Sequence, residues 1–170
     1  MEHLTEVLEL AAVEEATWAE KSAEIRASGV PVNMADFIAF NEGKTEMAAN
    51  GLPATCHFLL STKGVDAGTA HTAGETLAGA DLGEITGTGY ARKSQAEVTP
   101  VNGVCTFAQM SWDTGSATNW PASVRSIVLA TGPAASGKAI CAWNLQAGGA
   151  PRDLSAANTT ENVTPTLNVG

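Results

Sequence analysis

The spacing of hydrophobic residues changes along this chain, from a helical repeat at the N-terminus to alternation with a period of two further on. Residues 1–28 contain no Gly or Pro and are rich in Ala, Glu and Leu, so they predict a helix. Its hydrophobic positions follow a heptad-like spacing: Leu4, Leu8, Ala11, Trp18 and Ile25. Because Glu15 and Ser22 interrupt that spacing, a regular two-stranded coiled coil is not expected. Gly29 and Pro31 end the helix, since both residues are unfavourable inside one.

A second helix is predicted over residues 34–49. Asn33 is a suitable N-cap for it, and the sequence Asn-Gly-Leu-Pro at residues 50–53 ends it. Its larger apolar side chains would lie on one side and pack into the core: Phe37, Phe40 and Met47.

From residue 54 onward the pattern is that of short β-strands. Residues 54–61 alternate, with His57 on the more polar face. Further strands are predicted at residues 90–99, 104–112, 123–131, 138–145 and 162–169. Residues 124–130 are apolar on both faces apart from two positions, which is typical of a central strand, whereas Pro165 suggests an edge strand.

These elements predict a mainly β chain. We expect an antiparallel β-sandwich or barrel-like domain with one leading helix over residues 34–170, because short strands at such spacing are typical of those folds. An N-terminal α-helical arm and linker, residues 1–33, would precede it. A loop rich in Gly, Ala and Thr at residues 62–83 is long for a compact domain and is a candidate contact surface.

The stretch Gly-Glu-Ile-Thr-Gly-Thr-Gly-Tyr-Ala-Arg, residues 83–92, is expected to organise the β-rich part. Its glycines predict a tight turn that leads into a strand. Tyr90, the only tyrosine, should pack its ring on a sheet face with its hydroxyl near water, and Arg92 should lie on the same side. Such an element is a structural device and not a reaction centre.

The order of these elements resembles that of the small β-rich virion structural proteins of tailed bacteriophages, especially phages of actinobacteria. Three features carry the resemblance: Cys-His-Phe-Leu-Leu-Ser at residues 56–61, Glu-Ile-Thr-Gly-Thr-Gly-Tyr-Ala-Arg at residues 84–92, and later strands with Trp112 and Trp120. The resemblance extends over roughly residues 35–169. Proteins of that kind are labelled minor structural, decoration or tail-fibre-like, and the resemblance supplies no catalytic residues.

Charge and composition exclude several classes of function. The formal net charge is −9 and the pI is near 4.6, which argues against a nucleic-acid groove, since phosphates require clustered Lys and Arg. Seven glutamates against Lys21 and Arg26 leave residues 1–28 with a net charge of −5. No hydrophobic run has the length of a membrane helix, and the N-terminus is acidic where a signal peptide would be basic. We therefore expect no membrane partner and assembly in the host cytoplasm.

The cysteines and one glycine-rich loop are candidate sites of chemistry. The cysteines lie far apart within apolar strand patterns, so buried free thiols are expected, and no spacing indicates a metal site: Cys56, Cys105 and Cys141. Residues 132–138 match the glycine and lysine positions of a phosphate-binding loop. However, Ala139 stands where a hydroxyl is needed, and a strand follows instead of a helix. A solvated hairpin loop is expected there.

No other motif indicates catalysis. The histidines have no recognisable partner in the sequence, and no serine lies in a nucleophile elbow. Several carboxylates are available, but the sequence places no pair of them together: Glu75, Asp81, Glu84 and Asp113. We expect neither a cofactor nor a metal.

The leading hypothesis is a non-enzymatic virion structural protein, with a capsid decoration or minor capsid role ahead of a tail-associated one. Its partners would be other virion proteins, namely major capsid or tail subunits, and further copies of itself in a homo-oligomer. The alternatives are a tail-fibre-like protein that binds host-surface carbohydrate and a cell-wall hydrolase. The arm can dock on a neighbour or pack on its own domain, and the sequence leaves both open. The candidate partner contacts are Leu4, Leu8, Ala11, Trp18, Ile25, Tyr90 and Arg92.

Overall fold

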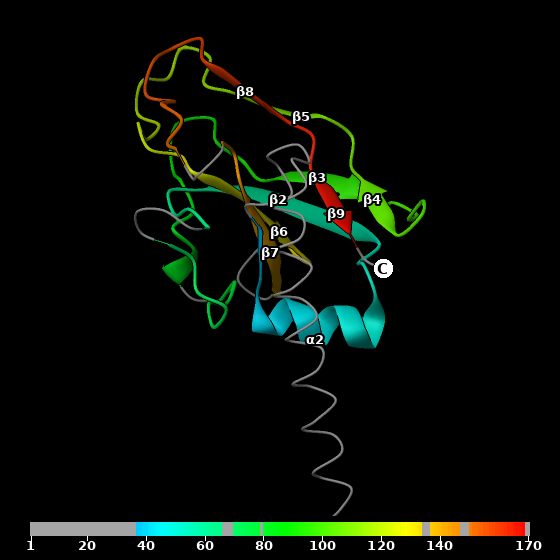
Figure 1. The fold of residues 1–170 in the computed structure, drawn as a ribbon. Helices are drawn as coiled ribbons and strands as arrows, with labels where there is room; N and C mark the ends of the chain where they lie inside the picture. Colours follow the sequence, from blue (N-terminus) through cyan, green and yellow to red (C-terminus); the bar gives the residue numbers. More distant parts are fainter. Residues whose placement is uncertain (1–36, 66–69, 79, 134–136, 147–149, 169–170) are drawn as a thin grey trace, which may run out of the picture.

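The computed structural model describes residues 37–65, 70–78, 80–133, 137–146 and 150–168. Over these ranges the chain is mainly β, with antiparallel sheets and one α-helix, as predicted (Figure 1). The predicted arm, residues 1–33, lies outside the described residues, and so do five of the candidate partner contacts: Leu4, Leu8, Ala11, Trp18 and Ile25.

The largest sheet has five strands in the order β1-β7-β6-β2-β3, and every neighbouring pair is antiparallel. Its strands are β1 (Phe37–Ala39), β7 (Ala139–Asn144), β6 (Ser126–Ala130), β2 (Thr55–Ser61) and β3 (Lys93–Ala96). Every residue of β6 and β7 is buried, so the prediction of a central strand after residue 123 is confirmed. The alternation predicted for β2 is confirmed for its first half, and from Phe58 to Ser61 the strand is buried on both faces.

Two smaller sheets form one interrupted ribbon. β4 (Val104–Thr106) pairs with β9 (Thr166–Asn168), and β5 (Met110–Asp113) pairs with β8 (Thr160–Val163). The sequence predicted one continuous strand on each side, which is wrong. Three residues, 107–109, lie opposite two, 164–165, so the chain carries one extra residue and bends, as in a β-bulge. The Gln95 side chain binds both backbone groups of Ala108, at 2.7 and 2.9 Å, and so ties this bend to the edge strand β3.

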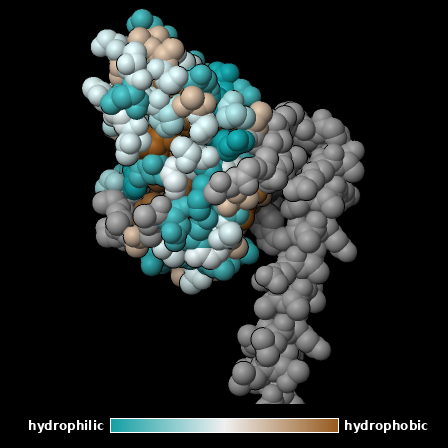
Figure 2. Space-filling view, turned by 90° about the vertical axis from the view of Figure 1, so that its left-hand side faces the viewer, coloured by the Kyte–Doolittle hydropathy of each residue, from teal (hydrophilic) through white to brown (hydrophobic). Residues whose placement is uncertain are grey.

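The large sheet buries apolar side chains on both faces. On one face, residues from β2, β6 and β7 pack with side chains from the ribbon and its connections, including Phe107, Trp112, Trp120 and Leu154. The opposite face carries a smaller cluster: Phe40, Leu59, Leu77, Leu82, Val128, Ala130, Ala139 and Ala142. On the side of the molecule seen in Figure 2, the described surface is mostly hydrophilic or neutral, and the strongest hydrophobic colour lies in small recesses.

The helix predicted over residues 34–49 is only partly correct. Phe37 to Ala39 form β1, paired with β7, and the helix α2 spans Asn41–Asn50. Pairing with β7 supplies hydrogen bonds and apolar contacts to these residues that a helix could not, and Phe37 packs against Trp143 with ring centroids 5.8 Å apart. Consequently Phe37 and Phe40 do not share a helix face with Met47. The predicted end is confirmed, because Gly51 adopts φ 71° and its N–H donates to the Met47 carbonyl.

Two further predictions are confirmed. The turn before β4 has Asn102 and Gly103 at φ 53° and 76°, and Val101 and Val104 exchange backbone hydrogen bonds across it. The cysteines are free and buried, as expected: Cys56, Cys105 and Cys141.

The long loop between β2 and the Gly83–Arg92 stretch packs on the sheet. We call its described part the strap: residues 62–65, 70–78 and 80–83, including the short 3₁₀ helix η2 (Ala80–Leu82). The strap buries Leu77 and Leu82 in the smaller cluster, and it also buries His71 and Glu75. It therefore contributes to the core as well as to the surface.

Candidate functional site

The Gly83–Arg92 stretch joins three parts of the fold. Gly83 adopts φ 61°, which favours glycine, and Glu84 then pairs with Ser61 at the end of β2. The Ile85 N–H donates to the Leu60 carbonyl at 3.0 Å. The stretch therefore extends the edge of the sheet beyond β3, whose pairing with β2 ends at Phe58.

Tyr90 completes that edge with its side chain. Its hydroxyl accepts a hydrogen bond from the Leu60 N–H at 3.0 Å and lies 3.2 Å from Glu84 Oε1, to which it donates. Its ring meets the Trp120 ring edge-on, with centroids 5.5 Å apart. The prediction of a ring packed against the sheet is confirmed, and Tyr90 as a whole is half-buried. Its hydroxyl takes the place of a missing ladder partner of β2, and burial raises the pKa of Tyr90.

Arg92 lies on the same side as Tyr90, as predicted, and forms a two-pronged ion pair with Glu84. Its Nε and Nη2 atoms lie 2.8 and 2.6 Å from the two carboxylate oxygens. The hydrogen bonds to Glu84 raise the pKa of Arg92 further, against the opposing effect of burial. A third contact, at 3.5 Å, reaches the Gly132 carbonyl in the β6–β7 hairpin.

The Gly-Thr-Gly turn, residues 87–89, attaches this stretch to Asn119 and Trp120 in the connection that follows β5. A Cβ atom on Gly87 would overlap the Trp120 indole ring, so only glycine fits there. The Trp120 Nε1–H donates to the Thr88 carbonyl at 2.9 Å, and the Asn119 side chain binds Thr88 twice, at 3.0 and 3.1 Å. The Gly83–Arg92 stretch is thus the joint between the main sheet and the layer formed by the ribbon and its connections.

An open groove of about 710 Å³ lies along this joint. Its lining combines buried apolar side chains with the ion pair: Leu77, Leu82, Gly83, Glu84, Ile85, Thr86, Tyr90, Ala91, Arg92 and Pro133. The Arg92 and Glu84 side chains are 17% and 29% exposed, so the polar part is accessible from the groove. The volume falls in the range of ligand pockets, while the open form suits an inserted segment of a neighbouring protein.

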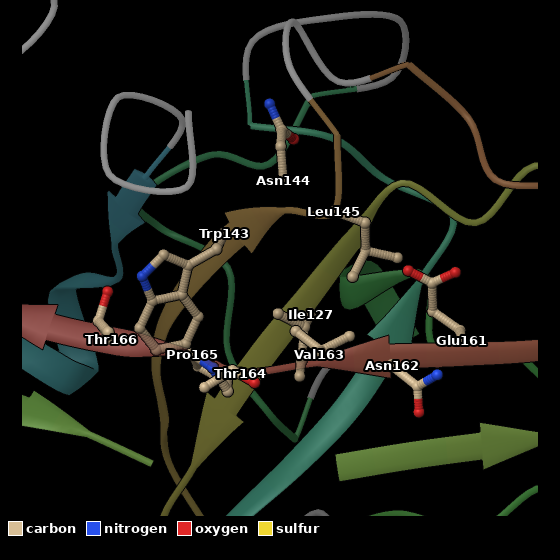
Figure 3. A pocket seen from close by; sticks show the side chains of 10 residues that line it. All are labelled: Ile127, Trp143, Asn144, Leu145, Glu161, Asn162, Val163, Thr164, Pro165 and Thr166. Carbon is tan, nitrogen blue, oxygen red and sulfur yellow. The ribbon is translucent and has the colours of Figure 1, made fainter. Parts of the chain in front are cut away.

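A second, smaller cavity of about 80 Å³ lies where β6 and β7 meet the β8–β9 side of the ribbon (Figure 3). Its side chains come from β6, β7 and the β8–β9 strands, and they include Ile127, Trp143 and Glu161. Arg152 Nε lies 2.8 Å from Glu161 Oε2, so the buried carboxylate is paired. The cavity has room for a few water molecules but not for a substrate of ordinary size.

The structure also contains a chain of buried polar side chains that the sequence did not reveal. Ser126 Oγ lies 3.0 Å from His71 Nε2, and His71 Nδ1 lies 2.6 Å from Glu75 Oε2. The other carboxylate oxygen of Glu75 lies 2.6 Å from Lys63 Nζ. The prediction that the histidines lack partners is therefore wrong for His71. The only available signal was the spacing of four between His71 and Glu75, while Ser126 is 55 positions away.

Burial and hydrogen bonds together set the protonation of His71 and Glu75. Burial lowers the pKa of His71, although the hydrogen bond to Glu75 acts in the opposite direction. For Glu75, burial acts to raise the pKa, but the hydrogen bonds from Lys63 and His71 outweigh it, so the pKa is lowered. The ordinary state is consequently a neutral imidazole between a hydroxyl and an ion pair.

The order Ser-His-Glu is that of a nucleophilic triad, but its setting differs. Ser126 is fully buried at the start of the central strand β6, and the His71 side chain is 0% exposed. A nucleophile must contact its substrate, so in this conformation the three groups act as a structural tie between strap and sheet.

Two further residues considered in the sequence, Lys138 and His57, lie apart from this cluster. Lys138 follows the β6–β7 hairpin and is exposed, and β7 continues as a strand, so the expected hairpin is confirmed. His57 is half-buried on β2, consistent with a position near the surface.

Within the described ranges no group of His, Cys, Asp and Glu side chains is arranged to hold a metal ion, and no helix has the length and apolarity to cross a membrane. Comparison of the chain with protein-family models, curated proteins and solved structures gave no match.

Proposed function

We propose that this chain is a non-enzymatic structural protein of a tailed-phage virion, which decorates the capsid or serves as a minor capsid protein. The β-rich part would form a sandwich-like packing module that contacts neighbouring virion subunits. The acidic N-terminal arm, predicted over residues 1–33, would add a second contact. Repeated copies would cement the particle by many modest interfaces, and the protein would accumulate in the virion after assembly in the host cytoplasm.

The observation that carries this proposal is the role of the Gly83–Arg92 stretch. The residues through which the chain resembles virion proteins bind one another and the backbone of the sheet: Glu84, Tyr90 and Arg92. Their polar groups are thus engaged in holding the fold. Residues that hold a fold together are characteristic of its architecture. The resemblance to virion proteins is a resemblance of architecture, and these residues are the ones that carry it.

The groove beside the joint supplies the surface for a neighbour. Its apolar floor and central ion pair offer both buried area and directional hydrogen bonds, which are the usual components of a protein interface. Tyr90 and Arg92 would then contact the neighbour through the groove while they keep their internal bonds.

The first test is the composition of purified virions of the phage that encodes this chain. Quantitative mass spectrometry should find it at a fixed ratio to the major capsid protein, in a number set by the symmetry of the shell. Recovery only with isolated tails, together with binding to host cell-wall carbohydrate, would favour the tail-fibre-like alternative. Absence from the particle would overturn the proposal.

The second test concerns the groove. Thr86 is exposed and lines it, so Thr86→Arg should fill the groove without disturbing the internal bonds of the joint. Thr106 is also exposed but lies on β4, outside the groove, so Thr106→Arg is the matched control. Particles assembled without this protein should take up the wild type and the control equally, and should take up Thr86→Arg poorly. Equal uptake of all three would exclude the groove as the contact.

The arm requires a separate comparison. A chain that begins at Asn33 should keep the unfolding midpoint of the full chain but bind particles more weakly, if the arm docks on a neighbour. A strongly lowered midpoint with unchanged particle binding would instead mean that the arm packs on its own domain.

A further inference from the structure

Three polar side chains form a row across one end of the three central strands of the main sheet. Ser61 on β2 lies opposite Ser126 on β6, which lies opposite Asn144 on β7. All three are buried, at 0%, 0% and 4% exposure, on the face that carries the smaller apolar cluster. Polar groups at such positions are costly unless they are hydrogen-bonded.

Each member of the row binds the strap. Ser61 Oγ donates to the Leu82 carbonyl at 2.5 Å and accepts from the Lys63 N–H at 2.9 Å. Asn144 Oδ1 accepts from the Val65 N–H at 2.7 Å. The middle member, Ser126, is bound through an ionisable side chain, His71. The same part of the strap also binds the start of α2: the Asn41 N–H donates to the Ala73 carbonyl and the Leu77 N–H donates to Glu42 Oε1, each at 2.8 Å. Release of this part of the strap must therefore break these two bonds as well.

The surroundings of His71 make protonation of its neutral imidazole ring unfavourable. Glu75 and Lys63 face it from the strap, Ser126 faces it from β6, and the Phe40 ring packs edge-on against it at 5.5 Å. With neutral His71, the charges of Glu75 and Lys63 cancel. A proton on His71 would leave one net positive charge in a buried site beside an aromatic ring, with little water to solvate it.

The hydrogen bond to Ser126 is also affected. In the neutral form, Nδ1–H donates to Glu75 and Nε2 accepts the Ser126 hydroxyl proton. In the charged form Nε2 becomes a donor to Ser126 Oγ, so the direction of this hydrogen bond is reversed. The Ser126 hydroxyl proton then loses the acceptor that it has in the neutral form.

We propose that the Lys63-Glu75-His71-Ser126 chain is an acid-sensitive clasp, in which protonation of His71 detaches the middle of the strap, residues 70–78, from β6. Detachment uncovers the apolar side chains beneath it, including Leu59, Val128 and Ala142. The ends of the strap remain attached, because the Gly83 carbonyl accepts from the Thr62 N–H and because Ser61 and Asn144 bind backbone groups of the strap. This inference is independent of the proposed virion function.

Hydrogen exchange of the full chain, followed by mass spectrometry between pH 8 and pH 5, tests the clasp. Release takes up one proton, so protection factors of residues 70–78 should fall by about tenfold per pH unit once the pH is below the ordinary His pKa. Protection in β6 and β7 should change much less over the same range. A loss of protection in β6 and β7 in step with the strap would mean global unfolding and would refute a local clasp.

Two substitutions make the test specific. His71→Gln cannot titrate, so its strap protection should not depend on pH beyond intrinsic exchange, whereas His57→Gln, the control on β2, should behave as the wild type. Lys63→Gln removes the positive charge next to the clasp, so the closed form should tolerate protonated His71 and the strap should open less in acid. This second substitution gives a result even if His71→Gln does not fold. An unchanged pH dependence in Lys63→Gln, or in a folded His71→Gln, would overturn the proposal.

Discussion

The role of the Tyr90 hydroxyl can be measured by comparing Tyr90→Phe with Tyr90→Ala. The hydroxyl is the partner of the Leu60 N–H in β2, and Leu60 is fully buried. Phe keeps the ring and its packing against Trp120 but removes the acceptor. Leaving a buried N–H without a partner costs about 1–3 kcal/mol, so Tyr90→Phe should lower the free energy of unfolding by that amount. Tyr90→Phe also removes the hydrogen bond to Glu84, but Glu84 keeps its ion pair with Arg92, so this adds little to the loss of stability.

Tyr90→Ala removes the ring as well. Truncation of a buried aromatic side chain costs about 3–5 kcal/mol, so the alanine variant should be less stable than the phenylalanine variant by about 2 kcal/mol. Both differences are a substantial fraction of the total stability of a typical domain, which is about 5–15 kcal/mol.

Urea unfolding followed by tryptophan fluorescence measures both values. The slope of free energy against urea should be the same in all variants, because the folded state is unchanged. Val101 is 71% exposed, so Val101→Ala is a suitable control and should change stability by less than about 0.5 kcal/mol. A loss below about 0.5 kcal/mol in Tyr90→Phe would show that water satisfies Leu60, and a loss below about 1 kcal/mol in Tyr90→Ala would place the ring on the surface.

Three further predictions follow from buried contacts. Gly87→Ala should destabilise by about 1–3 kcal/mol in the same urea assay, because its methyl group would overlap the indole behind it, and wild-type stability would contradict that contact. Burial raises the pKa of Cys56 to about 11 and that of Cys141 well above its usual value, so a thiol reagent at pH 8 should label both only on unfolding; rapid labelling of the native chain would show that the thiols are accessible. The pKa values of His71 and Glu75 are lower in the folded state, so the unfolded state binds more protons and stability should fall in acid, first below about pH 6.5 and further below about pH 4.5. A stability that is constant from pH 7 to pH 4 would contradict the protonation states assigned here.

The sequence by itself determined the parts of the fold that depend on local pattern. The strands β2, β6 and β7 were predicted because each alternates or is apolar throughout, and that pattern reflects burial whichever strand lies beside it. The turn at Asn102 and Gly103 and the end of α2 at Gly51 were predicted because positive φ angles depend on the residue type itself.

Tertiary structure decided what depends on partners distant in the chain. Phe37 to Ala39 form a strand because β7, about a hundred residues later, offers an edge to pair with, and no local signal competes with the apparent helix cap at Asn33. The predicted strands after residues 104 and 162 are each broken, because the register on one side of the ribbon carries one residue more than the other.

In the candidate sites, too, local features were predictable from the sequence and contacts between distant segments were not. The sequence placed Tyr90 and Arg92 on one side because they are two residues apart, but it could not assign the Tyr90 hydroxyl to Leu60, which is 30 positions away. The His71 clasp could not be found at all, since it requires the strap to fold across β6 and bring Ser126 to the imidazole. Hydrogen bonds between distant segments leave no periodic trace in a sequence. They exist only once the hydrophobic faces, which the sequence does specify, have brought those segments together.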